Sequence, residues 1–535
     1  MSEYEKVLKQ LGSYGPLHYF GKYQFRVFII VSLFETPAAW AMLLPILINA
    51  KPTWTCYENS VNATSNMTLN YTMNACTADN KMCSTIKFSE DFTSIISEWH
   101  LICDNEGIPS IITTIQMVGV FLGACITGQL ADKYGRKKPL YLEYLLLLIL
   151  LFCSAFVQSW QTFTVLRFFI GGLVGGVLVT NFVLPLEYVI PSWRVFCGCV
   201  GFWAVGLMLL APLGYFIRDW RTLTMVSSLV GLPMLLSWRL VPESPRWLLS
   251  KGRYEEAKQI ILTMAAYNKV DNPDLTQLHI SMKIDGNNNK GCQMYSYHNL
   301  FRNPKSAFHS FIAMFSWFVS SSVYYGLNFN TKNLAGDRYI NIFISGVVEI
   351  PALVFVLLIS NKIGRRKTIS ILMMLAGISC FSVLFIDLAV SGEKSSGLTF
   401  LTIVLAMLGK SGIAGGWAAV QVFSAETFPT VVRNIGIAAC SMSARVGGVV
   451  APQFVSLNSI QQSLPFTIFG GLALACGVLV CFLPETAGRP LPDKLDMDRI
   501  VEAPLTDKGR KNKSGNEELL ENIPLQNDYT EENCI

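Results

Sequence analysis

Six ionisable side chains lie inside long apolar stretches, where a charge is unfavourable unless it has a partner. Such a charge usually has a structural or functional role. The six are Glu35, Glu143, Glu349, Asp387, Lys410 and Arg445. A carboxylate can bind an ammonium group, and a guanidinium can bind a carboxylate through two parallel hydrogen bonds. Charges at mid-membrane depth face a partner or a cavity and mark the path of a polar solute. The sequence therefore predicts recognition of a small charged molecule in apolar surroundings.

The elements that position these charges are apolar runs long enough to cross a bilayer. Of the 535 residues, 51% are hydrophobic and 15% are charged, and about 20 apolar residues span the hydrocarbon as a helix. Twelve such runs are predicted, at residues 25–48, 108–130, 140–157, 163–186, 195–217, 223–240, 308–327, 340–359, 369–390, 398–423, 435–455 and 466–483. The expected fold class is all-α, a polytopic membrane protein with two six-helix bundles.

The chain also repeats itself. A basic turn at residues 128–138 returns in shorter form at residues 361–367. Four landmark pairs recur in order at an offset of about 240 residues, namely Asp132 with Asn361, Arg167 with Lys410, Glu187 and Arg194 with Glu426 and Arg433, and Pro242-Glu243 with Pro484-Glu485. This order favours an internal duplication, with the halves related by an axis along the membrane normal.

Basic residues cluster after the second, sixth and eighth runs, which lie on one side if the runs alternate. The positive-inside rule assigns that side to the cytoplasm. The predicted organisation is a cytoplasmic N-terminus without a signal peptide, an N-terminal bundle with an outer loop at 49–107, a cytoplasmic linker with short helices, a C-terminal bundle and a disordered cytoplasmic tail. The ranges are 1–24, 25–241, 242–307, 308–483 and 484–535.

The outer loop carries two signs of an extracellular segment. Glycosylation sequons begin at Asn62, Asn66 and Asn70. The same loop holds Cys56, Cys76, Cys83 and Cys103, an even number that suits two disulfides, with three pairings open.

Several other classes of function lack support in the sequence. There is no P-loop pattern, so ATP-driven pumping is not expected. The five histidines are scattered, and no cluster has metal-ligand spacing. The basic runs are short turns beside apolar segments, which argues against nucleic-acid binding. No catalytic constellation is visible, so we expect neither an enzyme nor a cofactor.

Motifs in the correct order resemble the major facilitator superfamily and, within it, the organic cation, carnitine and organic anion transporter family. They are SEWHLICD at 97–104, GQLADKYGRKK at 128–138, PESPRWLLSKGR at 242–253, AETFPTVVRN at 425–434 and LPET at 483–486. The long outer loop with its sequons distinguishes this family from sugar porters that share the PESPR element. The resemblance covers about residues 1–493 and carries little information on substrate.

The resemblance implies gating clamps at the cytoplasmic ends of the bundles. The residues expected to form these clamps are Asp132, Arg136, Glu187, Arg194, Arg365, Glu426 and Arg433. Such clamps close while the central site faces outward and break when it faces inward. A simpler alternative is that the basic residues only set topology, but topology does not need the acids that recur at the same spacing.

The resemblance also implies a substrate site in the middle of the membrane. Its expected residues are Tyr324, Tyr325, Glu349, Lys410, Arg445 and Glu35. Arg445 is the most informative, because family members selective for simple cations resemble this stretch but have an acid there, whereas carnitine-type and anion-type members have a basic residue. Alternatives stay open: Arg445 as a structural partner of Glu349, Lys410 as its helper or as the partner of an acid, and Glu35 as a cavity residue or a helix-pairing residue.

The expected function is transport of small organic ions across the plasma membrane by alternating access. Organic cations or zwitterions such as carnitine are the first expectation, organic anions the second, and a non-transporting receptor on the same scaffold the third. The expected partners are a small organic-ion substrate, the lipid bilayer and a coupling ion such as sodium or a proton.

Overall fold

The computed structural model describes residues 3–12, 20–60, 68–73, 76, 85–190, 193–194, 196–197, 201–271, 273–276, 278, 301, 303–389, 395–428 and 433–486. Within these ranges each of the twelve predicted apolar runs contains a helix. By length and composition, seven helical segments of the described chain are apolar enough to cross a membrane. The predictions at Asn62, Asn66 and Cys83, and those for the tail beyond residue 486, lie outside the described residues.

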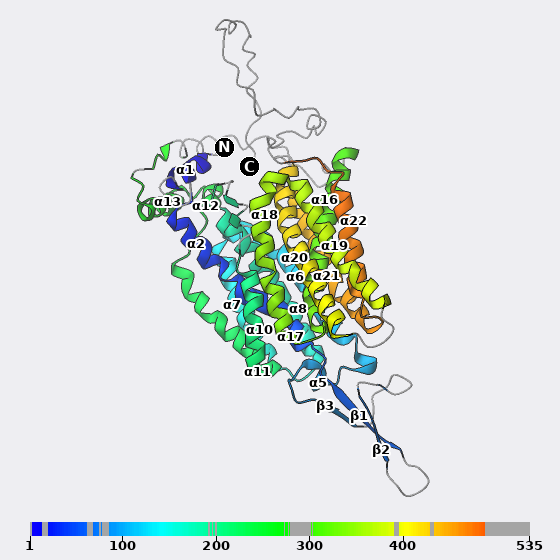
Figure 1. Ribbon diagram of the computed structural model, residues 1–535. Helices are drawn as coiled ribbons and strands as arrows, with labels where there is room; N and C mark the ends of the chain where they lie inside the picture. Colours follow the sequence, from blue (N-terminus) through cyan, green and yellow to red (C-terminus); the bar gives the residue numbers. More distant parts are fainter. Residues whose placement is uncertain are drawn as a thin grey trace.

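The helices form two groups that lie next to each other (Figure 1). The N-terminal group contains α2 (Lys22–Ser32), α3 (Glu35–Leu43), α4 (Pro45–Ile48), α6 (Ile108–Tyr134), α7 (Lys137–Ser154), α8 (Trp160–Leu186), α10 (Trp203–Phe216), α11 (Trp220–Gly231) and the 3-10 helix η2 (Leu232–Arg239). The C-terminal group contains α16 (Pro304–Asn330), α17 (Arg338–Val347), α18 (Glu349–Ile363), α19 (Arg365–Ala389), α20 (Ser396–Thr427), α21 (Arg433–Ser456) and α22 (Leu464–Val480).

Short elements mark the two ends of this bundle. At the linker end lie α1 (Glu3–Gly12), α12 (Pro245–Ser250) and α13 (Tyr254–Asn268), and at the sheet end lie the strands and α5 (Ile95–Trp99) (Figure 1). The apolar spacing in the linker predicts a helix, and α13 confirms it. The linker end also holds the first basic turn, because the Trp247 indole N–H of α12 donates to the carbonyl of Asp132 at 3.0 Å.

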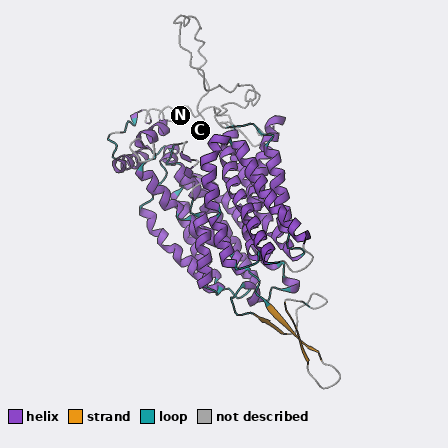
Figure 2. Cartoon of the chain, in the orientation of Figure 1, coloured by secondary structure: helices purple, strands orange, loops and turns teal. Residues whose placement is uncertain are grey.

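The all-α expectation missed one feature, a small sheet in the outer loop (Figure 2). Strands β1 (Trp54–Ser60), β2 (Thr68–Met73) and β3 (Thr85–Phe88) pair antiparallel in the order β2-β1-β3. The register sets Cys56 opposite Thr72 and Trp54 opposite Phe88. Threonine, tyrosine and isoleucine favour such pairing, but the loop was interpreted from its cysteines and sequons, and no strands were predicted.

Glycines allow α6 and α8 to pack closely. A Cβ at Gly123 would come within 1.9 Å of the Gly172 carbonyl oxygen, and one at Gly171 within 2.0 Å of the Gln116 carbonyl. Small residues let helix backbones approach within a membrane, where burial from water does not drive association. The glycine-rich face of α8 therefore forms the contact with α6.

Candidate functional site

A break in the eighth apolar run places Glu349. Helix α17 ends at Val347 and α18 begins at Glu349. Pro351 explains the break, because proline has no N–H to continue the hydrogen-bond ladder and its ring clashes with the preceding turn. Glu349 thus stands in the first turn of α18, where the partial positive charge of a helix N-terminus favours a carboxylate.

Glu349 is neutralised within the C-terminal group. The ammonium of Lys410, on α20, lies 2.8 Å from its Oε1, and the two side chains are only 2% and 5% exposed. The Tyr324 hydroxyl donates to both carboxylate oxygens at 3.0 Å. Lys410 also donates to the Asn328 amide oxygen. The structure therefore supports the alternative in which Lys410 pairs with an acid, and Glu349 is not the partner of Arg445.

Asn328, one turn after Tyr324 on α16, is also a member of this cluster. Its amide nitrogen donates to the Tyr324 carbonyl one turn earlier on α16, at 3.1 Å, which aims its oxygen at Lys410. Its spacing of four residues from Tyr324 is the signal that points to it, since residues i and i+4 share one helix face.

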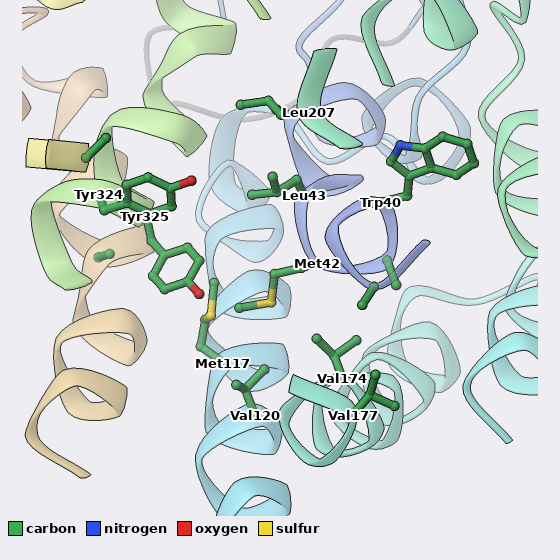
Figure 3. Packing of buried hydrophobic residues seen from close by; sticks show 14 of the residues in the cluster. Trp40, Met42, Leu43, Met117, Val120, Val174, Val177, Leu207, Tyr324 and Tyr325 are labelled. Atoms are coloured by element: carbon green, nitrogen blue, oxygen red, sulfur yellow. The ribbon is translucent and has the colours of Figure 1, made fainter. Parts of the chain in front are cut away.

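Aromatic rings surround the ion pair. The Lys410 ammonium lies 4.3 Å from the centre of the Tyr324 ring. Trp417 makes edge contacts with Tyr324 and Tyr325, at centroid distances of 5.3 and 6.0 Å. Figure 3 shows Tyr325 pointing from α16 toward Met117 on α6 of the other group. Tyr324 therefore supports the ion pair, while Tyr325 lies at the boundary between the groups.

Arg445 lies at the middle of α21 and is half-buried. Its guanidinium is close enough to Tyr325 for a coulombic interaction with the hydroxyl. Within the described ranges it makes no hydrogen bond or ion pair. The neighbouring turn packs tightly on α16, since a Cβ at Gly447 would come within 2.3 Å of the Phe318 carbonyl oxygen. A cation thus remains available beside the boundary between the groups.

Glu35 makes contacts that pair helices. Its carboxylate accepts from the Asn181 amide at 3.0 Å and from the backbone N–H groups of Phe202 and Trp203, where α10 begins. It therefore caps the N-terminus of α10 from α3. Of the two alternatives for Glu35, these contacts match the helix-pairing role.

The clamp residues form ion pairs inside each group. Arg136 bonds Asp132 at 2.6 Å and Glu187 at 3.3 Å. Burial lowers the pKa of this guanidinium, but Glu187 and Asp132 outweigh it, and the net effect is a raised pKa. Arg365 bonds Glu426 at 3.2 Å in the same manner, and the Nε of Arg433 donates to the Phe428 carbonyl at 3.3 Å.

The landmark pair Pro242-Glu243 and Pro484-Glu485 has the same structural role in both halves. The Glu243 carboxylate accepts the backbone N–H of Arg136 at 2.8 Å, at the start of α7, and the Glu485 carboxylate accepts that of Arg365 at 2.7 Å, at the start of α19. Gly135 precedes the first site with a φ of 101°, a backbone conformation that favours glycine. The duplicated sequence therefore encodes a duplicated helix cap.

Arg194 has a partner that the sequence did not predict. It bonds Glu5 of α1 at 3.2 Å, and the Tyr4 hydroxyl donates to the Glu187 carbonyl at 3.0 Å. Burial and the nearby Arg246 lower the pKa of Arg194, and Glu5 opposes this effect. The N-terminal helix is thus tied to the clamp residues of the first group.

The outer loop is described only in part. Cys76 and Cys103 form a disulfide with their Cα atoms 5.9 Å apart. Of the three pairings left open, this one would leave Cys56 for Cys83, which lies outside the described residues. Asn70 lies in β2 opposite Glu58.

Comparisons with known proteins identify transporters that are similar to this chain. Residues 52–494 match the family model described as "Sugar (and other) transporter". The chain is 34% identical to the organic cation transporter protein of Drosophila melanogaster, over 92% of this chain and 94% of that one. It is also 34% identical to organic cation/carnitine transporter 2 of Homo sapiens, over 77% of this chain and 73% of that protein.

Solved structures with the same fold include the xylose transporter XylE from E. coli in a partially occluded inward open conformation. The TM-score is 0.63 at 16% identity, covering 88% of this chain and all of that one. The chain therefore belongs to the organic cation/carnitine transporter family (solute carrier family 22) of the major facilitator superfamily, and it is a multi-pass membrane transporter.

Proposed function

We propose that this protein carries small zwitterionic organic ions, of which carnitine is an example, across the plasma membrane. One observation carries the proposal: Arg445 is half-buried without an acidic partner in the described structure, whereas Glu349 is already neutralised by Lys410. A buried acid that is already paired offers little to a substrate cation, while an unpaired guanidinium favours a carboxylate.

The substrate ammonium group would rest against aromatic rings. A ring face attracts an ammonium by about 0.5–2 kcal/mol, and Tyr325 and Trp417 offer such rings near Arg445. The indole N–H of Trp417 is buried and has no hydrogen-bond partner among the described residues. A zwitterion of carnitine's kind would combine a carboxylate for Arg445 with a positive group for the rings. Relatives named organic cation/carnitine transporter 2 support this class.

Contacts between the groups support alternating access. At the sheet end, Gln453 donates to Thr114 at 2.8 Å and Lys332 to the Asn49 carbonyl at 3.3 Å. Tyr215 and Tyr339 also pack there, with ring centres 5.7 Å apart. These contacts tie the groups at one end, and they would have to separate for a substrate to enter from that side. The clamp pairs at the linker end would then exchange partners across the groups in the opposite state.

The two ends of the bundle support the proposed sidedness. The sheet end carries the sequon at Asn70 and the disulfide of Cys76, which suit an oxidising exterior. The basic turns lie at the opposite end (Figure 1). Both termini would accordingly face the cytoplasm.

Organic anions are the second candidate, because the same unpaired Arg445 would accept them. Uptake of labelled carnitine, tetraethylammonium and benzoate in expressing cells separates the classes. We expect saturable carnitine uptake, lost in Arg445→Asp and partly kept in Arg445→Lys. Arg253→Asp, at an exposed linker site, is the matched control and should transport normally. Unchanged carnitine uptake in Arg445→Asp would overturn the assignment, and specific binding without uptake of any probe would favour a receptor.

A further inference from the structure

The first predicted apolar run contains a helix break at Pro45. Helix α3 ends at Leu43 and α4 begins at Pro45. In an unbroken helix the N–H of residue 45 would donate to the carbonyl of Ala41, but proline has no N–H. Ala41 is completely buried, and an unpaired buried carbonyl costs free energy comparable to a lost hydrogen bond. The break therefore needs a hydrogen-bond donor from elsewhere in the fold.

Two side chains of the N-terminal group donate to this carbonyl. The Gln116 amide nitrogen, on α6, lies 3.2 Å from the Ala41 oxygen, and the Arg167 guanidinium, on α8, lies 3.4 Å from it. Both side chains are completely buried. Gln116 also donates to the next carbonyl of α3, that of Met42, at 3.4 Å. The close packing of α6 on α8 at Gly171 brings the two donors to the same turn of α3.

Arg167 corresponds to Lys410 in the internal repeat, and both cations lie at a broken helix. The Arg167 guanidinium lies 4.8 Å from the centre of the buried Phe163 ring and contacts α3 just before the break. Lys410 contacts Glu349, the first residue of α18, just after the break from α17. In each half, the repeated buried cation thus meets a segment where proline interrupts the helix.

The segment beyond the break reaches the contact between the two groups. The Asn49 side chain, directly after α4, is anchored on α6 by the Thr113 hydroxyl at 3.0 Å. The Asn49 carbonyl accepts from Lys332 of the C-terminal group at 3.3 Å. Before the break, Figure 3 shows Met42 pointing from α3 toward Met117 of α6. The angle between α3 and α4 therefore sets where α4 meets the C-terminal group.

We propose that Arg167 and Gln116 are positioning residues for transport. By donating to the Ala41 carbonyl they fix the bend at Pro45, and the bend holds the end of α4 where it contacts Lys332. In this role they act through α4 and do not contact the substrate. The effect on transport rests on the transport function proposed above, whereas the role of the two donors at the bend does not depend on it.

The first test is a thermal unfolding cycle on purified full-length protein. Pro45→Ala restores the N–H that can pair the Ala41 carbonyl within the helix, and Arg167→Met removes the guanidinium but keeps an apolar stem. Arg167→Met should lower the unfolding midpoint by several degrees in the wild-type background, and by less than about half as much in the Pro45→Ala background. Thr180→Val is the matched control, because Thr180 is equally buried on α8 but bonds only carbonyls of its own helix. Its shift should be the same in both backgrounds.

Gln116→Leu repeats the cycle with the second donor, so the test does not depend on the folding of Arg167→Met. A coupling to Pro45→Ala is again expected, because Gln116 bonds the same carbonyl. Equal shifts in the two backgrounds would overturn the proposal, since the donors would then stabilise the protein independently of the bend.

The second test is carnitine uptake, corrected for the amount of protein at the cell surface. Arg167→Met should lower the maximal rate about tenfold and change KM by less than about threefold, because a conformational step is affected and a substrate contact is not. Arg167→Lys keeps a positively charged donor and should recover part of the rate. Unchanged uptake, or a KM raised about tenfold at an unchanged maximal rate, would overturn the positioning role. Absence of uptake of every probe by wild-type protein would instead refute the proposed function, and the thermal cycle would still decide the role at the bend.

Discussion

Breaking the ion pair between Lys410 and Glu349 should strongly destabilise the protein, because both side chains are buried. Glu349→Gln keeps the shape of the side chain and removes its charge. The Lys410 ammonium, 2% exposed, would then lack a counter-charge. Stranding one partner of a buried pair costs about 3–5 kcal/mol. The Asn328 oxygen and the Tyr324 ring, which also contact the ammonium, place the expected cost toward the lower end.

The assay is thermal unfolding in detergent, followed by tryptophan fluorescence. For a unit of 150–250 residues, 1 kcal/mol shifts the midpoint by about 2–4 °C, so Glu349→Gln should unfold on the order of 10 °C below wild type. Lys410→Met should also be destabilised, but less, because a stranded carboxyl can take up a proton.

The double variant Lys410→Met/Glu349→Gln tests the coupling. With both charges removed no ion is stranded, and replacing a buried ion pair by neutral groups is often close to neutral. We expect the double variant to be more stable than Glu349→Gln alone. Additive losses, or a Glu349→Gln midpoint within about 2 °C of wild type, would refute the claim that these two charges stabilise each other.

Three further predictions concern the periphery. Gly135→Ala should lower the free energy of unfolding by about 1–3 kcal/mol, because its φ is positive and a Cβ would meet the Glu243 carboxylate at 2.3 Å. Gly128→Ala, where a Cβ would have nothing within 4 Å, is the control, and equal thermal unfolding midpoints for the two variants would contradict the Glu243 cap. Cys76→Ser should cost about 3–4 kcal/mol, because the bond closes a separation of 27 residues, and non-reducing peptide mapping should find Cys76 linked to Cys103 and to no other cysteine. Glu5→Gln should loosen α1, seen as faster hydrogen exchange over residues 4–12, because Glu5 bonds Arg194. Gln10→Ala, on the exposed face of the same helix, is the control and should leave exchange unchanged; equal exchange in both variants would exclude Glu5 as the anchor.

The internal duplication could be recognised in the sequence because the repeated residues make the same contacts in both halves. Glu243 and Glu485 recur after a proline in both halves, and each caps the helix that follows a basic turn. A carboxylate at a helix N-terminus, beside a glycine of positive φ, is a local arrangement that short motifs can encode. The basic turns and the acids near them were therefore predictable as neighbours in the structure.

Other partners were not predictable, since they depend on packing between distant helices. Arg194 pairs with Glu5, 189 residues away, rather than with the acid seven residues before it. Glu35 is an acid inside an apolar run, which suggests substrate binding, yet its position beside the start of α10 makes it a helix cap. Sequence shows which charges are buried in apolar runs, but not which helices carry their partners.

Length, hydropathy and charge placement alone determined the helical class, the membrane environment and the two-fold repeat. The physical reason is that a backbone in lipid must satisfy its hydrogen bonds within each segment, so an apolar run of sufficient length can only be a helix. Tertiary structure alone decided how the charges combine. Lys410 meets Glu349, and Arg445 stays unpaired in the described structure, because the rotation and contact of α18, α20 and α21 around α16 depend on the packing of whole helices.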